Sequence, residues 1–239
     1  MLRRERWIIA LAALVGVAVT ARLGWWQLDR AAQKNAIQAQ IESRRALPPA
    51  TLADLARQPA AELTHRAIRA PGRWVDSATI FLDNRQMGGR PGFYVLTPLR
   101  LADGSAIIVQ RGWVPRDLLD RTKVSAPALP QGEVEVIGRL APPPSRLLEF
   151  EASASGVIRQ NVDPAQWQRE LRLPLQPLSL LQTEPRSGDG LLRDWPEPAS
   201  GVHKHYGYAF QWFALATLIV VLYVWFQHLR PQFRHRRNA

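Results

Sequence analysis

Hydrophobic residues gather in two long runs near the ends of the chain. Residues 206–226 hold 21 consecutive uncharged residues, and residues 7–28 hold 22 residues of which only Arg22 is charged. About 20 apolar residues in a helix cross the roughly 30 Å hydrocarbon core of a bilayer. Aromatic residues favour membrane–water interfaces, and they stand near both ends of the second run: Tyr206, Tyr208, Trp212, Tyr223, Trp225 and Phe226. The pattern predicts two transmembrane helices in a lipid bilayer.

The first run has a second interpretation. Residues 7–21 alone resemble the apolar region of a signal peptide, with small residues before Arg22. The apolar pattern resumes immediately after Arg22, however, and an arginine near a helix end can extend its guanidinium to the headgroups. We therefore expect an uncleaved anchor.

Charge in the flanking segments predicts the topology. Residues 1–6 hold three arginines and one glutamate, and residues 227–239 hold four arginines and no acid. Short flanks rich in arginine stay in the cytoplasm. We expect a multi-pass protein of the bacterial inner membrane with both termini cytoplasmic: a cytoplasmic N-terminus (1–6), a basic cytoplasmic tail (227–239) and a periplasmic main domain between the spans.

The segment between the two runs changes from helical to strand-like character. Residues 29–64 predict a helical extension and linker, with Thr51 as a helix cap. Residues 65–205 predict a β-rich domain and a return linker. Strand-like runs occupy residues 66–75, 78–84, 92–101, 106–114, 133–141 and 175–184, with a hairpin at Asp103-Gly104 and a helix capped by Asp163. The predicted fold is a membrane protein in which two transmembrane α-helices flank a mainly antiparallel-β, small barrel-like outer domain with one or two short helices.

Composition excludes several functions. The chain has no cysteine and two methionines, which rules out disulfides, a cysteine nucleophile and a thiolate copper site, and leaves too few thioethers for another copper site. The net charge is +11, but the two tails and Arg22 carry more than half of it, so it indicates topology and not nucleic-acid binding. The outer domain should fold without metal or disulfide.

Catalytic motifs are not evident, so we expect no enzyme activity, although folding can assemble a carboxylate pair that sequence does not reveal. The glycine-rich residues 88–92 are expected to form a turn. Arg85 and Arg90 flank this loop and are expected to be solvated. Residues 111–113, Arg-Gly-Trp, are expected at a strand end and a turn, with a partner-contact surface as the alternative.

Four motifs occur in order along nearly the whole chain: LGWWQLDRAAQK at 23–34, GRPGFYVLTPL at 89–99, VQRGWVP at 109–115 and HYGYAFQWFALA at 205–216. Together they resemble the surfeit-locus family of cytochrome c oxidase assembly factors. The resemblance implies help in building the oxidase core subunit through handling of haem a, with haem a synthase and other assembly factors as further candidate partners. A membrane-anchored scaffold that docks on assembly partners without a cofactor is the alternative function.

The fourth motif holds the candidate haem ligand. The family pattern H-x-x-Y-A-x-x-W-F falls on residues 205–213, and its residues His205, Tyr208, Ala209 and Trp212 share one helix face by spacing. We expect His205 to bind haem iron, a macrocycle to pack on Tyr208 and Trp212, and Ala209 to leave room for it. The simpler interpretation places His205 in an aromatic interface belt.

Two further residues are weaker candidates for the same site. His203 lies outside the family pattern and would point elsewhere on a continuous helix, so it ranks second as a ligand. Arg22 would pair with a haem propionate, since guanidinium suits carboxylate, but contact with lipid headgroups explains it equally well. Trp25 and Trp26 are most simply interface anchors.

Overall fold

The computed structural model describes residues 3–117, 119–120, 122–125, 127–147, 156–185, 188–196 and 201–229. They form two compact units. One unit consists of Met1–Gln40 with Glu197–Ala239, and the other is Ile41–Pro196. We call them the helix pair and the β-domain, and describe each by itself.

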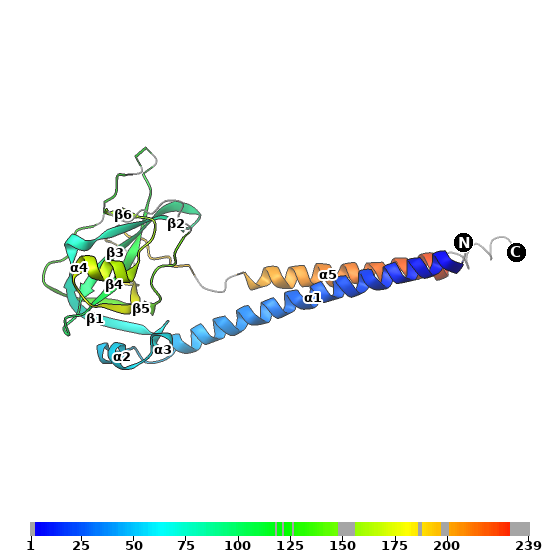
Figure 1. Ribbon diagram of the computed structural model, residues 1–239, viewed down its shortest axis with the longest axis horizontal. Helices are drawn as coiled ribbons and strands as arrows, with labels where there is room; N and C mark the ends of the chain where they lie inside the picture. Colours follow the sequence, from blue (N-terminus) through cyan, green and yellow to red (C-terminus); the bar gives the residue numbers. More distant parts are fainter. Residues whose placement is uncertain are drawn as a thin grey trace. The chain divides into compact units, whose positions relative to one another are not determined.

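The helix pair consists of two long helices that run antiparallel and side by side (Figure 1). α1 (Arg3–Arg45) has 43 residues and continues well past the apolar run, as expected for a helical extension. It ends before Pro48 and Pro49, which disfavour further helix. α5 (Val202–Val224) continues into a π-helical turn, η2 (Trp225–Leu229).

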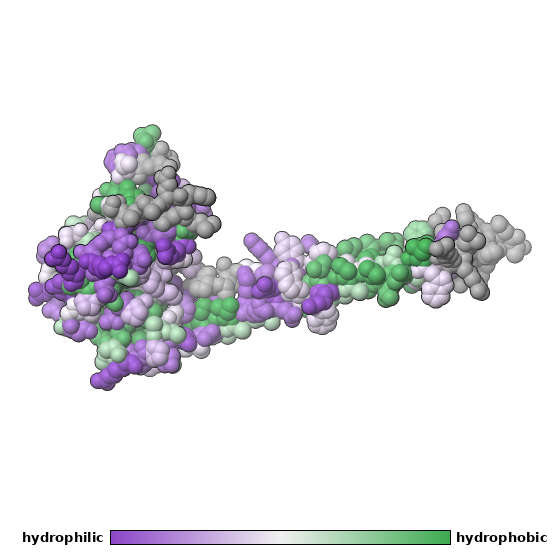
Figure 2. Space-filling view, in the orientation of Figure 1, coloured by the Kyte–Doolittle hydropathy of each residue, from purple (hydrophilic) through white to green (hydrophobic). Residues whose placement is uncertain are grey.

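Large hydrophobic side chains are exposed along both helices, including Trp7, Leu11, Leu14 and Phe210. Figure 2 shows hydrophobic residues over much of the visible face of the pair. Both helices are long and apolar enough to cross a membrane. An exposed apolar surface of this size is unfavourable in water and favourable in lipid, so the two helices suggest membrane anchoring.

The β-domain is built on one seven-stranded sheet of order β1-β5-β7-β4-β3-β2-β6. Its strands are β1 (Ala67–Trp74), β2 (Ile80–Met87), β3 (Arg90–Arg100), β4 (Ala106–Pro115), β5 (Glu133–Ala141), β6 (Ile158–Arg159) and β7 (Leu175–Gln182). Most neighbours are antiparallel, but the β4–β7 and β2–β6 pairs are parallel, so the sheet is mixed. β1 also meets β3 through two residue pairs, which curls the sheet. That short contact does not establish a closed barrel, and the barrel-like shape stays a prediction.

Short helices and turns follow the local sequence signals. α2 (Leu52–Arg57) begins with a capping box between Thr51 and Asp54, and α3 (Ala60–Leu63) follows it. α4 (Pro164–Leu171) is capped by Asp163, whose carboxylate accepts hydrogen bonds from two backbone N–H groups. The predicted hairpin at Asp103-Gly104 joins β3 to β4, and residues 88–89 form the predicted turn with positive φ at both glycines. A one-turn 3-10 helix, η1 (Asp76–Ala78), lies between β1 and β2.

The core of the β-domain lies on both sides of the sheet. One cluster of buried side chains gathers where β1, β5, β7 and β4 face α2 and α3, and it includes Leu63, Ile68 and Leu180. A second cluster lies under α4, where Trp167 is 1% exposed and packs on strand residues such as Leu82 and Ile108. These apolar contacts stabilise the domain in a chain without cysteine.

Two expectations from the sequence were wrong in this domain. Arg85 is not solvated but 5% exposed, because Nη2 donates to the Gln160 carbonyl oxygen at 3.1 Å and its guanidinium lies over the Tyr94 ring. Residues 111–113 do not form a strand end and turn, nor an open contact surface. They lie inside β4 and are buried, because the strand is covered on both faces. Arg90 is exposed, as expected.

Candidate functional site on the helix pair

Small residues bring α1 and α5 close together. The packed seam contains Gly16, Thr20, Gly24 and Ala31 from α1, and Ala209 and Ala216 from α5. A Cβ atom built on Gly24 would lie 2.8 Å from Cζ of Phe213, so only glycine admits this ring. Close approach through small residues is how helices pack in a membrane, where no hydrophobic effect draws them together.

His205 lies in this seam and contacts α1 through one hydrogen bond. Its Nδ1 atom is 2.8 Å from Oε1 of Gln27, whose side chain is 9% exposed. An amide oxygen only accepts, so Nδ1 carries the hydrogen, and in a neutral imidazole Nε2 then has the lone pair. A histidine that binds a metal usually donates its other N–H to an acceptor that fixes tautomer and ring orientation. The contact therefore fixes the orientation of the His205 ring relative to α1.

The other three residues of the predicted helix face, Tyr208, Ala209 and Trp212, differ in how exposed they are. Tyr208 is half exposed and Trp212 is half-buried, so both rings are accessible near His205 along the helix. Ala209 is 2% exposed and lies in the packed seam. The expectation that Ala209 leaves room for a macrocycle was wrong, because helix packing takes up the space beside it.

His203 and Arg22 are not brought to His205. His203 is exposed, and two residues along a helix turn its side chain about 200° from His205. Arg22 is exposed and stands five residues before Gln27 on α1, a rotation of about 140° from the seam. The structure thus groups His205 with Gln27, and leaves the other two polar candidates on separate faces.

Sequence reasoning missed the polar partners on α1. Gln27 lies within the apolar run of residues 7–28, and an uncharged polar residue inside such a run commonly bonds a neighbouring helix. Asn35 forms a second bond between the helices, donating from Nδ2 to the Tyr206 hydroxyl at 3.1 Å. Trp25 is more than an interface anchor, because its ring meets Phe213 edge-on with centroids 6.0 Å apart.

Metal chemistry at His205 is limited by its neighbours. Within the described ranges, no group of three or more His, Cys, Asp or Glu side chains is placed to hold a metal ion. A single imidazole can bind iron where a macrocycle supplies the remaining nitrogens. The donors of the described helix pair are therefore compatible with a haem.

Comparison with known proteins gives one consistent result. The model of the SURF1 family matches residues 14–217. A SURF1-like protein of Rickettsia felis is 26% identical over 227 residues, covering 90% of this chain and 94% of the relative. A SURF1-like protein of Rickettsia bellii is 26% identical over 226 residues, covering 89% and 88%. The cytochrome oxidase assembly protein SHY1 of Saccharomyces cerevisiae is 25% identical over 129 residues, covering 52% of this chain and 33% of SHY1.

Proposed function

The chain belongs to the SURF1 family, and from this premise we propose that it is an assembly factor for the haem-copper cytochrome c oxidase. The sequence resemblance to surfeit-locus proteins is confirmed by the family match. The name of the yeast relative supports the assembly role. In this proposal the protein binds haem a and assists its insertion into the core subunit, without catalytic turnover.

The hydrogen bond between His205 and Gln27 is the observation that supports haem binding most directly. It holds the imidazole in the tautomer whose Nε2 atom can bind iron. Haem a, when bound, would supply an iron atom and a large apolar ring. Nε2 of His205 would bind the iron, and the accessible rings of Tyr208 and Trp212 would contact the macrocycle.

The proposed function also implies a location for the protein in the membrane. Haem is poorly soluble in water, so a carrier gains by holding it against an apolar helix. The charge bias of the flanks supports cytoplasmic termini and a periplasmic β-domain in the bacterial inner membrane. The partners would then be the oxidase core subunit, haem a synthase and other assembly factors.

The test compares bound haem in wild type, His205→Ala and His203→Ala. Each protein is expressed in cells that make haem a, purified in detergent, and measured by absorbance per protein. We expect His205→Ala to lose most of the haem and His203→Ala to keep it, because only His205 is oriented by Gln27. Equal haem in wild type and His205→Ala would refute the ligand assignment.

The scaffold function remains the second candidate, and the packing of Ala209 favours it. A seam closed at Ala209 leaves the macrocycle only the outer faces of Tyr208 and Trp212. A scaffold would need no such space and would dock through the exposed apolar surface of the helices. The absence of haem from all three preparations would favour this function.

A further inference from the structure

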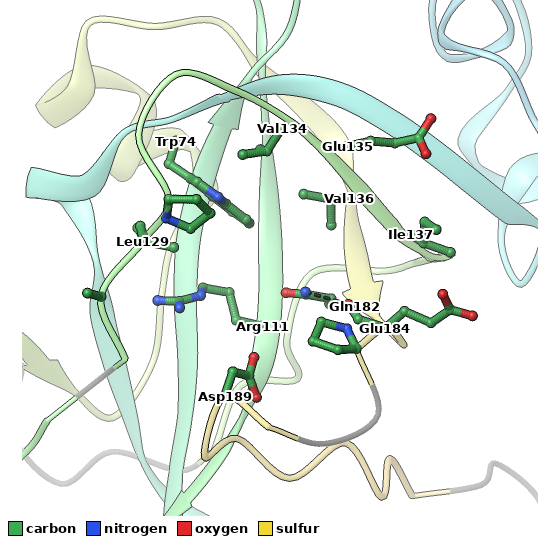
Figure 3. Close-up of a pocket in the computed structure, with 13 residues that line it drawn as sticks. Trp74, Arg111, Leu129, Val134, Glu135, Val136, Ile137, Gln182, Glu184 and Asp189 are labelled. Atoms are coloured by element: carbon green, nitrogen blue, oxygen red, sulfur yellow. Dashed lines mark hydrogen bonds between the residues drawn. The ribbon is translucent and has the colours of Figure 1, made fainter.

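The β-domain contains a cavity of about 440 Å³ between β4, β5, β7 and the chain around Leu129 (Figure 3). Trp74, Leu129, Val134 and Val136 form apolar walls, and Arg111 and Gln182 reach in from β4 and β7. Small-molecule and peptide sites have this character, with apolar walls and a few fixed polar groups. The volume is at the small end of that class, so it suits one side chain or a compact ligand.

Arg111 is directed into the cavity by an irregularity of the sheet. β3 pairs Val95 with Gly112 but Leu96 with Gln110, so Arg111 is the extra residue of a β-bulge. A bulge redirects a side chain that regular alternation would send elsewhere. Arg111 lies within a longer buried run, since all residues from Ala106 to Trp113 are buried.

The guanidinium of Arg111 is only partly satisfied. It is 4% exposed, lies over the Trp74 ring at 5.7 Å, and donates from Nη2 to the Pro127 carbonyl oxygen at 3.2 Å. Its Nη1 atom is buried and has no hydrogen-bond partner in the described parts of the chain. Burial lowers the pKa of Arg111 below its usual value, and Asp189 opposes that shift. A charged donor left unpaired in an apolar cavity is costly, so a ligand that accepts from it would be strongly favoured.

The acidic side chains at the cavity are engaged or turned away. Asp189 forms an ion pair with Arg193, whose Nη1 atom is 3.0 Å from its Oδ1. Oε2 of Glu135 lies 3.4 Å from Nη1 of Arg69, within ion-pair distance. Figure 3 shows the carboxylates of Glu135 and Glu184 pointing away from Arg111. After Asp189, two further charges act on the pKa of Arg111: Arg193 lowers it and Asp76, the smaller influence, raises it.

Among the described residues, Gln182 supplies an unpaired hydrogen-bond acceptor, whereas Arg111 supplies an unpaired donor. Its Nε2 atom donates to the Glu184 carbonyl oxygen at 2.6 Å, which fixes the amide. Its Oε1 atom is buried and, within the described residues, has no partner. The described residues therefore leave one charged donor and one neutral acceptor buried and unpaired on side chains that line the cavity.

We propose that this cavity binds an apolar carboxylate that carries a neighbouring N–H, the chemistry shared by an N-acylated amino acid and by the C-terminal residue of a polypeptide. The carboxylate accepts from Nη1 of Arg111, the N–H donates to Oε1 of Gln182, and the apolar side chain contacts Trp74 and its neighbours. This site lies in the β-domain and is independent of haem binding by the helix pair.

The test measures binding of N-acetyl-leucine to the full-length protein in detergent by isothermal titration calorimetry. N-acetyl-leucinamide, which lacks the carboxylate, is the matched ligand. Arg111→Met removes the donor, and Leu129→Trp fills the cavity from its wall. Arg57→Met is the matched control, because Arg57 is exposed on α2 and does not line the cavity.

We expect saturable binding of the acid to wild type and to Arg57→Met, and binding roughly ten- to a hundredfold weaker for the amide and for Arg111→Met. Leu129→Trp should also abolish binding, and it tests the site if Arg111→Met does not fold. A short peptide ending in leucine that binds tighter than N-acetyl-leucine would identify a polypeptide C-terminus as the source, and equal affinity would identify a free acid. No saturable binding to wild type, or equal binding of acid and amide, would overturn the proposal.

Discussion

Replacing Gln27 by leucine removes the acceptor of the His205 hydrogen bond and keeps a side chain of similar size. The bond is 2.8 Å long and Gln27 is 9% exposed, so water does not readily replace it. Loss of a partner that orients a metal ligand costs about 10- to 100-fold in affinity, or about 1.4–2.8 kcal/mol. One hydrogen bond between membrane helices contributes about 0.6 kcal/mol on average. Gln27→Leu should therefore weaken haem binding far more than it weakens the helix pair.

The assay titrates haem into detergent-purified wild type and variants and follows the absorbance of the bound form, with thermal unfolding measured in parallel. Asn35→Leu is the matched control, because it removes another hydrogen bond between the same helices without touching His205. It should keep wild-type haem affinity. Unchanged affinity in Gln27→Leu, or an equal loss in Asn35→Leu, would show that Gln27 does not orient the ligand.

Three further predictions concern packing and pH. Gly24→Val should lower the thermal stability of the helix pair in detergent, because its Cβ meets the Phe213 ring, and Phe213→Ala in the same chain should restore part of the loss. Trp167→Ala should cost about 3–5 kcal/mol of unfolding free energy in denaturant titrations, with Trp167→Phe costing less. Burial alone would raise the pKa of Asp189, but Arg193, the Leu191 N–H and Arg111 together hold it below its usual value of 3.8. The ionised Asp189 therefore stabilises the folded protein above pH 3.8, and this stabilisation is lost as the pH falls through the lower folded pKa. Asp189→Asn should thus flatten the fall in melting temperature at acid pH. Parallel curves of melting temperature against pH for wild type and variant would contradict this.

The sequence predicted most elements of the fold because their signals are local. Apolar or alternating runs located the six longer strands of the sheet, β1–β5 and β7, and single residues located the turns and caps, as with Asp163 before α4 and Asp103-Gly104 before β4. β6 was not predicted, because a strand of two residues, Ile158 and Arg159, is too short to show a periodicity. The parallel β4–β7 pair escaped because pairing between distant strands leaves no local pattern.

The candidate site was only half predictable for a related reason. The spacing from His205 to Trp212 defines one face of one helix, but it does not say which face meets a second helix. The structure shows that Ala209 faces into the seam and that Gln27 supplies the contact. The burial of Arg111, which was expected at a strand end and turn, was missed for a different reason: the bulge arises in the pairing of β4 with β3, which leaves no local pattern.

The two candidate sites differ in how binding would be stabilised. At His205 the polar partner is already in place, so the imidazole is oriented before any ligand arrives and little rotational freedom is lost on binding. At Arg111 the protein itself leaves Nη1 unpaired, and Gln182 leaves Oε1 unpaired, so the desolvation cost is already present in the folded state. A ligand that supplies both partners recovers that cost, whereas one that supplies neither gains only apolar contact. Selectivity at the cavity should therefore depend on hydrogen-bonding chemistry more than on size, and selectivity at His205 should depend on iron held in a macrocycle.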